Sequence, residues 1–312
     1  MQDFINYLQT KNHAEITQKK YTKSVADFLK WFTKEDINTT KKDVLEYLSY
    51  LKKNLHQTNS RRKGDLTALR HYFTFLQQND LIATNPTNFL KIRGARKKTL
   101  YNIYSFAELE QLNDNFYHNF IRNFNYNKYV GENDRERSLL CRERNYCMLG
   151  MLVYQGLLTK ELKKIKLTDL DLNKATLKIQ KAKKSNGRTI VLNATQIGVL
   201  INYTQQIRPK IANLYNQETE QLFLSYPISN EKNNIQDFRG VVQYLAKQVK
   251  KIDSNFLNFK QLRASVITNW IKNEGLRKAQ YLAGHRYISS TESYKVNDLE
   301  SLTDDIAKHH PF

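Results

Sequence analysis

The sequence predicts a mainly helical fold with a small β-sheet in the C-terminal part of the chain. Apolar residues recur at intervals of three and four along most of the 312 residues, which places them on one face of a helix. Gly and Pro, which interrupt helices, are few, with 10 and 4 copies. The pair Asn186-Gly187 separates two segments in which apolar and polar residues alternate, which is the pattern of a β-hairpin.

Residues 1–90 are predicted to form a compact domain of four or five helices. Their apolar residues form stripes with helical spacing: Phe4, Tyr7, Leu8; Tyr21, Val25, Phe28, Leu29, Phe32; Val44, Leu45, Leu48, Leu51; and Leu66, Leu69, Tyr72, Phe73, Leu76. Asn85-Pro86 ends this pattern, because a residue that precedes proline disfavours helical geometry.

Residues 91–100 are predicted to be a basic linker, since they hold little apolar content and several positive charges. A linker that follows a phosphate backbone has this composition, and so does an ordinary soluble linker. The first interpretation is favoured because the segment joins two basic domains. Its candidate phosphate contacts are Arg96, Lys97 and Lys98.

Residues 101–312 are predicted to form the second domain, with a C-terminal tail helix. It opens on a capping box, Ser105 to Glu108, and continues with a polar connection over residues 113–134. Residues 135–157 form a strongly apolar helix. Alternating segments around residues 177–179 and 190–192 then predict the hairpin, and helical spacing returns from about residue 195.

The charge balance favours a polyanionic partner. Fifty Lys and Arg against 30 Asp and Glu give a net charge of +20, and residues 1–98 and 99–312 carry equal shares of it. A positive surface on both halves suits nucleic acid better than a small acid. A solvated basic surface on a Lys- and Asn-rich protein explains the same numbers, so charge alone favours nucleic acid only modestly.

Several functional classes are excluded or made less probable by the composition. The chain has no apolar run long enough for a transmembrane helix and no secretory signal at its start, so a cytoplasmic protein without a membrane partner is expected. Two cysteines, Cys141 and Cys147, are too few for a disulfide scaffold. Glycine-rich phosphate loops and metal-ligand motifs are missing, so no metal and no cofactor are predicted.

The most informative residues lie near the C-terminus, in three short motifs. These are Lys260-Gln261-Leu262-Arg263, then Leu282-Ala283-Gly284-His285, then Tyr294. In order and spacing they resemble the tyrosine recombinase (phage integrase) family, with its [His/Lys]-x-x-Arg box, its Leu-x-Gly-His box and its nucleophilic tyrosine. The segment Gly156–Leu162, Gly-Leu-Leu-Thr-Lys-Glu-Leu, resembles the family's Gly-Leu-Arg-x-x-Glu-Leu box.

The resemblance implies a helical, SAM-like core-binding domain followed by the tyrosine-recombinase catalytic domain. It implies Tyr294 as nucleophile, with Arg263, His285 and Lys260 around the scissile phosphate. The hairpin lysine of the family best matches Lys183, with Lys181 and Lys184 as alternatives. In the first domain, the basic residues at the start of one amphipathic helix are candidates for backbone contact: Arg61, Arg62, Lys63 and Arg70.

The implied reaction needs no metal or ATP, because a phosphotyrosyl bond retains the energy of the broken strand. Cations near a tyrosine favour its phenolate, and an arginine fork stabilises the charge that grows on the phosphate oxygens. The implied partners are double-stranded DNA and three further copies of the chain on paired sites. Accessory DNA-bending proteins are a further partner that such an assembly admits. In this assembly the acidic tail, residues 297–308, is expected to dock on the next protomer.

One position departs from the family pattern. The family's first arginine falls on Leu158, which has no group that binds phosphate. Arg142 and Arg144 are candidate replacements, whereas Lys160 lies two positions along a helix and faces away. Three hypotheses therefore remain: an active recombinase, a DNA-binding relative that has lost cleavage, and an unrelated basic nucleic-acid-binding protein.

Overall fold

The computed structural model describes residues 1–94, 100–128, 131–182, 185–214, 219–225 and 237–297. The chain divides into two compact units, Met1–Thr99 and Leu100–Phe312. Each unit has its own cluster of buried apolar side chains, so each is described by itself. Within the described residues, none of the helices combines the length and apolarity needed to cross a membrane.

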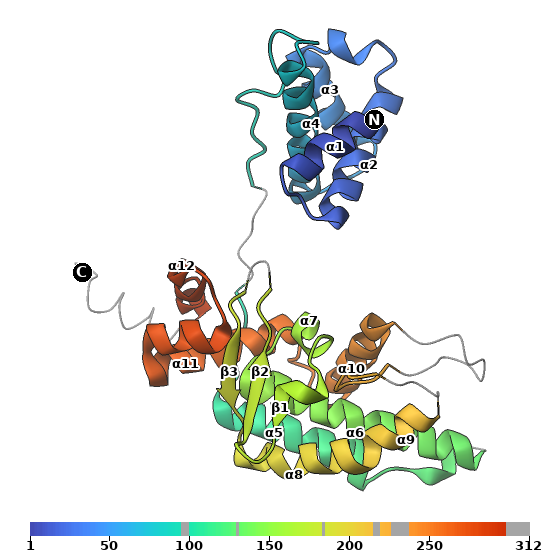
Figure 1. Ribbon diagram of the computed structural model, residues 1–312, viewed down its shortest axis with the longest axis vertical. Helices are drawn as coiled ribbons and strands as arrows, with labels where there is room; N and C mark the ends of the chain where they lie inside the picture. The colour runs from blue at the N-terminus through green and yellow to red at the C-terminus, as the bar shows by residue number, and fades with distance from the viewer. Residues whose placement is uncertain (95–99, 129–130, 183–184, 215–218, 226–236, 298–312) are drawn as a thin grey trace. The chain divides into compact units, whose positions relative to one another are not determined.

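The N-terminal unit is entirely helical in its described part (Figure 1). Its helices are α1 (Gln2–Thr10), α2 (Glu15–Trp31), α3 (Lys41–Lys53) and α4 (Asn59–Gln78), with a 3₁₀ turn, η1, at Asp36–Asn38. Side-chain caps start two of them: the Thr40 hydroxyl accepts from the Asp43 N–H, and the Thr58 hydroxyl accepts from the Arg61 N–H. Such caps satisfy N–H groups that have no partner within the helix.

The apolar stripes predicted from the sequence form the core of this unit. Phe4, Val25, Phe28, Leu69 and Phe73 are fully buried, and the ring of Phe28 meets that of Phe73 edge-on at 5.9 Å. Burying one large apolar side chain contributes about 1.5–3 kcal/mol. Several such side chains from all four helices therefore hold the bundle together.

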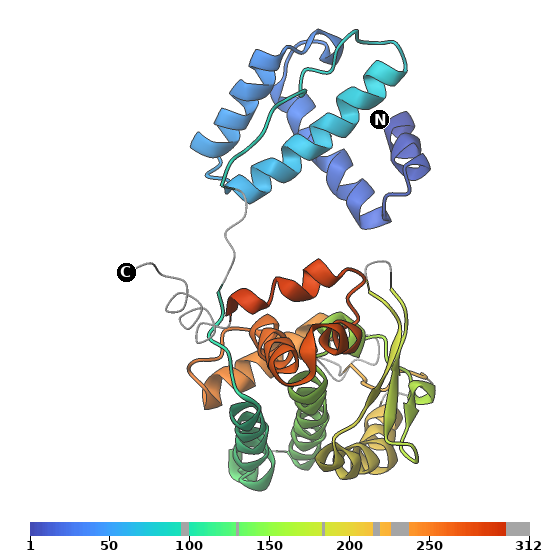
Figure 2. The same ribbon diagram turned by 90° about the vertical axis from the view of Figure 1, so that its left-hand side faces the viewer.

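The C-terminal unit is mainly helical, with one small sheet. Its main helices are α5 (Phe106–Tyr117), α6 (Glu132–Gln155), α7 (Thr159–Leu162), α8 (Ala194–Asn202), α9 (Arg208–Asn213), α10 (Phe238–Ile252), α11 (Phe259–Ala283) and α12 (Ile288–Glu292). Short 3₁₀ or π turns are η2 (His118–Arg122), η3 (Tyr126–Lys128), η4 (Leu167–Asp169), η5 (Tyr203–Ile207) and η6 (Lys295–Asn297). In Figure 2 the helices α5 and α6 lie beneath α11.

The region predicted as a polar connection, residues 113–134, is more helical than expected. Helix α5 continues to Tyr117, η2 extends it by another turn, and α6 already begins at Glu132. Phe116 is fully buried and its ring lies 4.9 Å from that of Phe120. Two aromatic anchors spaced four residues apart therefore outweigh the polar composition around them.

The sheet contains strands β1 (Leu170–Asp171), β2 (Thr176–Ile179) and β3 (Arg188–Val191), which pair antiparallel in the order β1-β2-β3. In the β2–β3 hairpin, Leu177 pairs with Ile190 and both side chains are buried, while the neighbouring pair, Lys178 and Thr189, faces outward. The alternating pattern around Asn186-Gly187 thus gave the correct structure, and the predicted fold class is confirmed.

Two glycine-ended helices position the functional region. Helix α6 ends at Gly156 with φ +54°, and a Cβ there would lie 3.0 Å from a methyl carbon of Val266 in α11. Helix α11 ends at Gly284 with φ +68°. A residue without a side chain adopts this left-handed backbone without strain. The chain therefore turns sharply at the ends of both helices, and Arg263 of α11 contacts both turns. The hairpin joins this region through the β-bridge between Ser185 and His285.

Candidate active site

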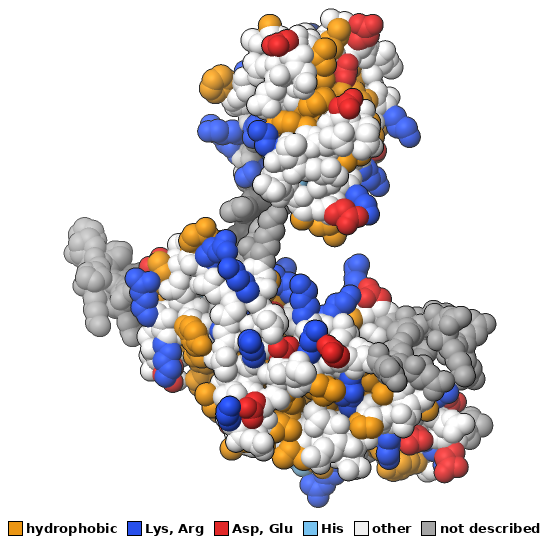
Figure 3. Space-filling view, viewed as in Figure 1, with side chains coloured by type: hydrophobic (Ala, Val, Ile, Leu, Met, Phe, Trp, Pro, Cys, Tyr) orange, Lys and Arg blue, Asp and Glu red, His pale blue; other side chains and the backbone are white. Residues whose placement is uncertain are grey.

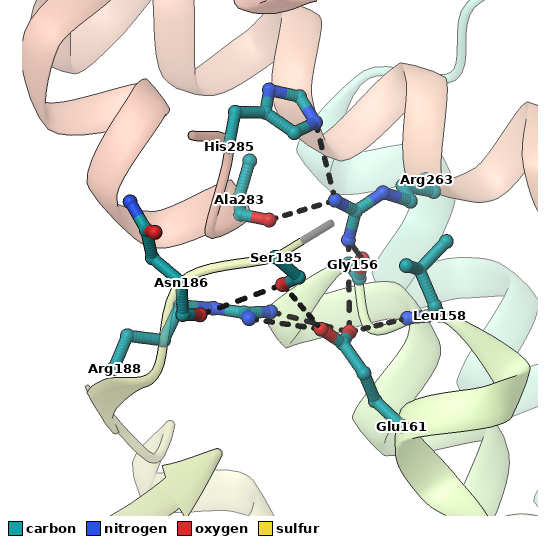
Figure 4. Close-up of polar contacts among 9 residues, drawn as sticks. All are labelled: Gly156, Leu158, Glu161, Ser185, Asn186, Arg188, Arg263, Ala283 and His285. Carbon is teal, nitrogen blue, oxygen red and sulfur yellow. Dashed lines mark hydrogen bonds and ion pairs between the residues drawn. The ribbon is translucent and has the colours of Figure 1, made fainter. Parts of the chain in front are cut away.

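Arg263 is the buried cation of the site. It projects from α11, is 5% exposed, and donates hydrogen bonds to the carbonyl oxygens of Gly156, at 2.6 Å, and Ala283, at 2.8 Å. These carbonyls come from the C-terminal ends of α6 and α11 (Figure 4). Burial lowers the pKa of Arg263, while Glu161 and Tyr294 act in the opposite direction. A guanidinium stays charged in proteins, so Arg263 provides a fixed positive charge.

His285 follows Gly284 and lies against Arg263. Its Nε2 is 3.3 Å from a guanidinium nitrogen of Arg263, and its Nδ1 is 2.9 Å from the hydroxyl oxygen of Thr291 in α12. Burial, followed by the charges of Arg263 and Arg188, lowers the pKa of His285 to about 4. The ring is therefore neutral near pH 7. Because arginine only donates, Nε2 is the acceptor and Nδ1 carries the proton.

Tyr294 stacks on His285. The two ring centroids are 5.6 Å apart, with 17° between the planes. The Tyr294 N–H donates to the carbonyl of Thr291, and its half-buried ring packs on the apolar core. Its hydroxyl also influences Arg263 through a side-chain hydrogen bond. The structure thus brings together three residues singled out from the sequence: Arg263, His285 and Tyr294.

Sequence reasoning did not identify Glu161, which lies at the centre of the same cluster. Its carboxylate accepts from Arg188 at 2.9 and 3.3 Å and from the Leu158 N–H at 2.8 Å. Burial raises the pKa of Glu161, but Arg188, Leu158 and Arg263 more than offset this, so the pKa lies below its ordinary value. Glu161 is therefore ionised although it is buried.

Arg188 is the second residue that sequence reasoning missed. It begins β3, and its side chain is 0% exposed beside Glu161. A Cβ on Gly284 would lie 2.5 Å from a guanidinium nitrogen of Arg188, so the glycine of the Leu-x-Gly-His box is required by close packing as well as by its φ. The Asn186 N–H donates to the Gly284 carbonyl at 3.0 Å. These contacts join the hairpin to the end of α11.

The lysine candidates are less tightly placed. Lys260 is exposed on α11, one turn before Arg263 and on the same side of the helix. Lys183 and its alternative Lys184 lie outside the described residues. Lys181, the other alternative, is exposed on the approach to the hairpin end.

The structure gives neither Arg142 nor Arg144 the role of a replacement at Leu158. Arg142 lies over the rings of Phe120 and Phe124 and donates to the Phe120 carbonyl. Arg144 is buried and donates to Asn145 and to the Leu224 carbonyl. The expectation that one of them reaches into the site is therefore wrong, because each guanidinium is held elsewhere.

Lys160 does not fill the place of the missing arginine either. It is exposed and lines a surface pocket between α7 and the hairpin, to which Glu161 and Ser185 also contribute. Leu158 itself is half-buried, and Figure 4 shows its side chain pointing away from the Glu161 carboxylate.

In the N-terminal unit, the four basic residues of α4 differ in how they are used. Arg62 donates to the Leu48 carbonyl and to Asn59, Arg61 pairs with Asp65 at 3.4 Å, and Arg70 donates to the Leu90 carbonyl. Lys63 is exposed, and no ion pair of its ammonium is found within the described residues. Arg62 is therefore partly a structural residue that ties α4 to α3.

Basic side chains lie on the visible surface of both units (Figure 3). The linker candidates Arg96, Lys97 and Lys98 are outside the described residues, and so is the tail beyond Asn297. In the part of the chain that is described, no group of three or more His, Cys, Asp or Glu side chains is arranged to hold a metal ion.

Comparison with known proteins identifies the family. The phage integrase family model matches residues 131–300, and the model of the phage integrase N-terminal SAM-like domain matches residues 1–83. The chain belongs to the phage integrase family. Tyrosine recombinase XerC of Bacillus pumilus is 26% identical over 319 residues, which cover 99% of this chain and 95% of that protein. XerC of Oceanobacillus iheyensis is 27% identical and covers similar shares, 99% and 94%.

Solved structures of the family show the same fold. The XerH site-specific recombinase, bound to a palindromic difH substrate after cleavage, matches with a TM-score of 0.67 at 19% identity, over 96% of this chain and 82% of that one. A lambda integrase fragment on a core site matches with a TM-score of 0.64 at 14% identity, over 95% and 94%. For this phage integrase family member, the resemblance inferred from the three C-terminal motifs is thus confirmed.

Proposed function

We propose that this phage integrase family member is a site-specific DNA recombinase that cuts and rejoins strands through a 3′-phosphotyrosyl intermediate on Tyr294. The observation that carries the proposal is the stacking of Tyr294 on His285, beside the buried guanidinium of Arg263. Apolar packing alone would not require a buried guanidinium beside this tyrosine. A phosphate that enters beside these residues meets a nucleophile and a cation together.

The proposed step transfers a phosphoryl group between two oxygens. The Tyr294 oxygen attacks the scissile phosphorus and gives up its proton, for which the neutral His285 ring beside it is the acceptor, and the bond from phosphorus to the 5′-oxygen breaks. Arg263 stabilises the charge that develops on the non-bridging oxygens. The hairpin lysine, Lys183 or its alternatives Lys181 and Lys184, protonates the leaving 5′-oxygen. Lys260 adds positive charge near the phosphate, and neither metal nor ATP takes part.

His285 is suited to accept a proton or a hydrogen bond when the phosphate arrives. It is neutral near pH 7, and its Nε2 lone pair is directed at Arg263 in the absence of DNA. If the phosphate takes over the Arg263 N–H, that lone pair becomes available to the reacting groups. An anion near the ring also raises the pKa of His285, which favours proton uptake during the reaction.

The partner in this proposal is double-stranded DNA, bound by both basic units and by the linker. The proposed working assembly is four copies on two paired sites, with the tail after Asn297 docking on the next copy. Lambda integrase, with the same fold, has been solved as a tetramer on a Holliday junction. Integration or excision of a mobile element is the biological role that this chemistry would serve.

Leu158 favours a second candidate function, that of a DNA-binding relative which does not cleave. Losing one positioned donor to the developing charge costs about 10²–10³ in rate. No side chain of the described residues was found to replace the arginine that the family has there. A slow recombinase and a non-cleaving relative differ in one measurable property, the covalent adduct.

Covalent trapping tests the proposal. Purified protein is mixed with nicked duplexes taken from the DNA that flanks its own gene, and the products are separated on a denaturing gel. The expected result is an SDS-resistant adduct that is absent from Tyr294→Phe and present in Tyr287→Phe, a control at an exposed tyrosine of the same region. Tight binding without an adduct would overturn the cleavage proposal and establish the non-cleaving relative.

A further inference from the structure

The buried carboxylate of Glu161 has two guanidinium neighbours, and it binds them unequally. Arg188 contacts both of its oxygens, at 2.9 and 3.3 Å. The nearer nitrogen of Arg263 is 3.9 Å from the same carboxylate, beyond hydrogen-bond distance. Arg263 instead donates to two backbone carbonyls and faces His285. Figure 4 shows the carboxylate between the two arginines.

This inequality matters because a carboxylate and a guanidinium form a strong bidentate pair in a buried place. An unneutralised Glu161 would attract the nearest cation, and after Arg188 that cation is Arg263. A guanidinium paired with Glu161 has fewer N–H groups and less net charge to offer to a phosphate. The occupation of Glu161 by Arg188 is therefore a condition for an available Arg263.

We propose that Arg188 is a positioning residue that neutralises Glu161 and so keeps the Arg263 fork available for the scissile phosphate. This inference rests on the proposed function. Two guanidinium groups against one carboxylate leave the cluster with one positive charge in excess, carried by Arg263, the arginine that interacts with Tyr294. Arg188 itself is fully enclosed, so it does not contact DNA.

Leu158 makes this arrangement more important in this chain. It offers Glu161 only its backbone N–H, at 2.8 Å, and no charge. Among the described residues, the guanidinium groups within ion-pair distance of Glu161 are those of Arg188 and Arg263. Within the described part of the chain, no third cation lies at ion-pair distance to occupy the carboxylate if Arg188 is lost.

Packing around Arg188 supports a fixed role. Gly284 covers its guanidinium so closely that a methyl group would not fit, and Ser185 is hydrogen-bonded to the same carboxylate at 3.4 Å. With 0% of the side chain exposed, solvent does not screen the pair. Its charge therefore acts strongly on Glu161, and it also contributes to the lowered pKa of His285.

A rescue experiment tests the inference. Adduct formation at saturating nicked duplex is compared in wild type, Arg188→Met, Glu161→Gln and the double variant. Arg188→Met should slow the reaction by about 10²-fold, the usual loss when one stabilising donor is misplaced, with DNA affinity nearly unchanged. The double variant should recover most of that loss, because no carboxylate remains to capture Arg263. A double variant as slow as Arg188→Met would overturn the proposal.

If Arg188→Met does not fold, as judged by circular dichroism, the other two variants still decide. The double variant should form the adduct within about threefold of the rate of Glu161→Gln. In Glu161→Gln the carboxylate is already gone, so removing Arg188 as well leaves no charge for it to have neutralised. A double variant much slower than Glu161→Gln would mean that Arg188 acts in another way, and would overturn the proposal.

Titration of His285 by NMR separates this inference from the proposed function, because it needs no cleavage. Among the described residues, the charged groups that act on His285 are Arg263 of α11, Arg188 of β3 and Glu161 of α7. Arg188→Met should raise the pKa of His285, since it removes a cation and frees a carboxylate. Adding Glu161→Gln should lower it again. An unchanged titration would overturn the inference, whereas a missing adduct in wild type with these shifts would refute only the proposed function.

Discussion

At the scale of the residue, His285 links the stability of the catalytic unit to pH. Its pKa is lowered from 6.5 to about 4, first by burial and then by Arg263 and Arg188. The folded protein therefore resists protonation at a pH where the unfolded chain already binds the proton. The contribution to stability is complete above pH 6.5 and is lost as pH falls towards 4.

We therefore predict that His285→Gln weakens the acid sensitivity of the C-terminal unit. Urea denaturation at pH 7, 5.5 and 4.5 measures the free energy of unfolding of wild type and variant. The difference between the two proteins should change over this range, with the wild type losing more stability. His118→Gln, at an exposed position of the same unit, is the matched control. A difference that stays constant between pH 7 and 4.5 would contradict the prediction.

The residue scale also shows which part of the site a single sequence reveals. Arg263, His285 and Tyr294 were found because the family spacing marks them, and the structure places them in contact. Glu161 and Arg188 were missed because they are 27 positions apart and their ion pair leaves no local pattern. A signal for Glu161 was nevertheless present, since it closes the Gly156–Leu162 box.

At the scale of the element, α4 shows how neighbouring basic residues take different roles. Arg62 is half-buried, and its guanidinium reaches the Leu48 carbonyl in α3. Lys63, the next residue, is exposed. The cluster of positive charges at the start of this helix suggested phosphate contact for all members. Charge patterning does not show which side chain turns inward, because consecutive positions on a helix lie about 100° apart.

We predict opposite effects for alanine at these two positions. Arg62→Ala should lower the free energy of unfolding of the N-terminal unit by about 1–2 kcal/mol, because the hydrogen bonds from its guanidinium to the Leu48 carbonyl and to Asn59 are lost. Lys63→Ala should change stability by less than about 0.5 kcal/mol, as expected at an exposed site. It should instead reduce the slope of log K against log salt for duplex binding by about 1.

Thermal melts and fluorescence anisotropy over a salt series measure these two quantities for both variants, so each serves as the control of the other. If Arg62→Ala leaves the melting temperature unchanged, the hydrogen bond from Arg62 in α4 to the Leu48 carbonyl in α3 does not stabilise the unit. If Lys63→Ala leaves the salt slope unchanged, Lys63 is a solvated side chain without a phosphate partner.

Elements with a local sequence signal were predicted better than elements that depend on contacts with distant residues. The capping box at Ser105 and the hairpin at Asn186-Gly187 have local signals and were found. Helix η2 was not foreseen because a long-range contact, the burial of Phe116 and Phe120 in the core, decides it. A mostly polar segment thus becomes helical when two of its aromatic side chains pack against a core formed by residues that are distant in the sequence.

At the scale of the whole molecule, the chain has two cores without a common residue. Positive charge is carried by both units, and proposed DNA contacts occur in both. Two modules that bind one ligand gain affinity from their connection, because binding of the first raises the local concentration of the second. The linker, residues 91–100, then contributes to binding even apart from its own charges.

We predict from this that the two units fold separately but bind DNA far better together. Fragments 1–94 and 100–312 should each unfold in one cooperative transition, because each retains its own core. Fluorescence anisotropy with one duplex should show the whole chain binding about 10²–10⁴-fold more tightly than either fragment, the usual gain from linking two sites. An equimolar mixture of the fragments should not restore this affinity, because its parts associate with DNA independently. If the 100–312 fragment alone matched the whole chain, the N-terminal unit would contribute nothing to binding, and the linked two-unit arrangement would be wrong.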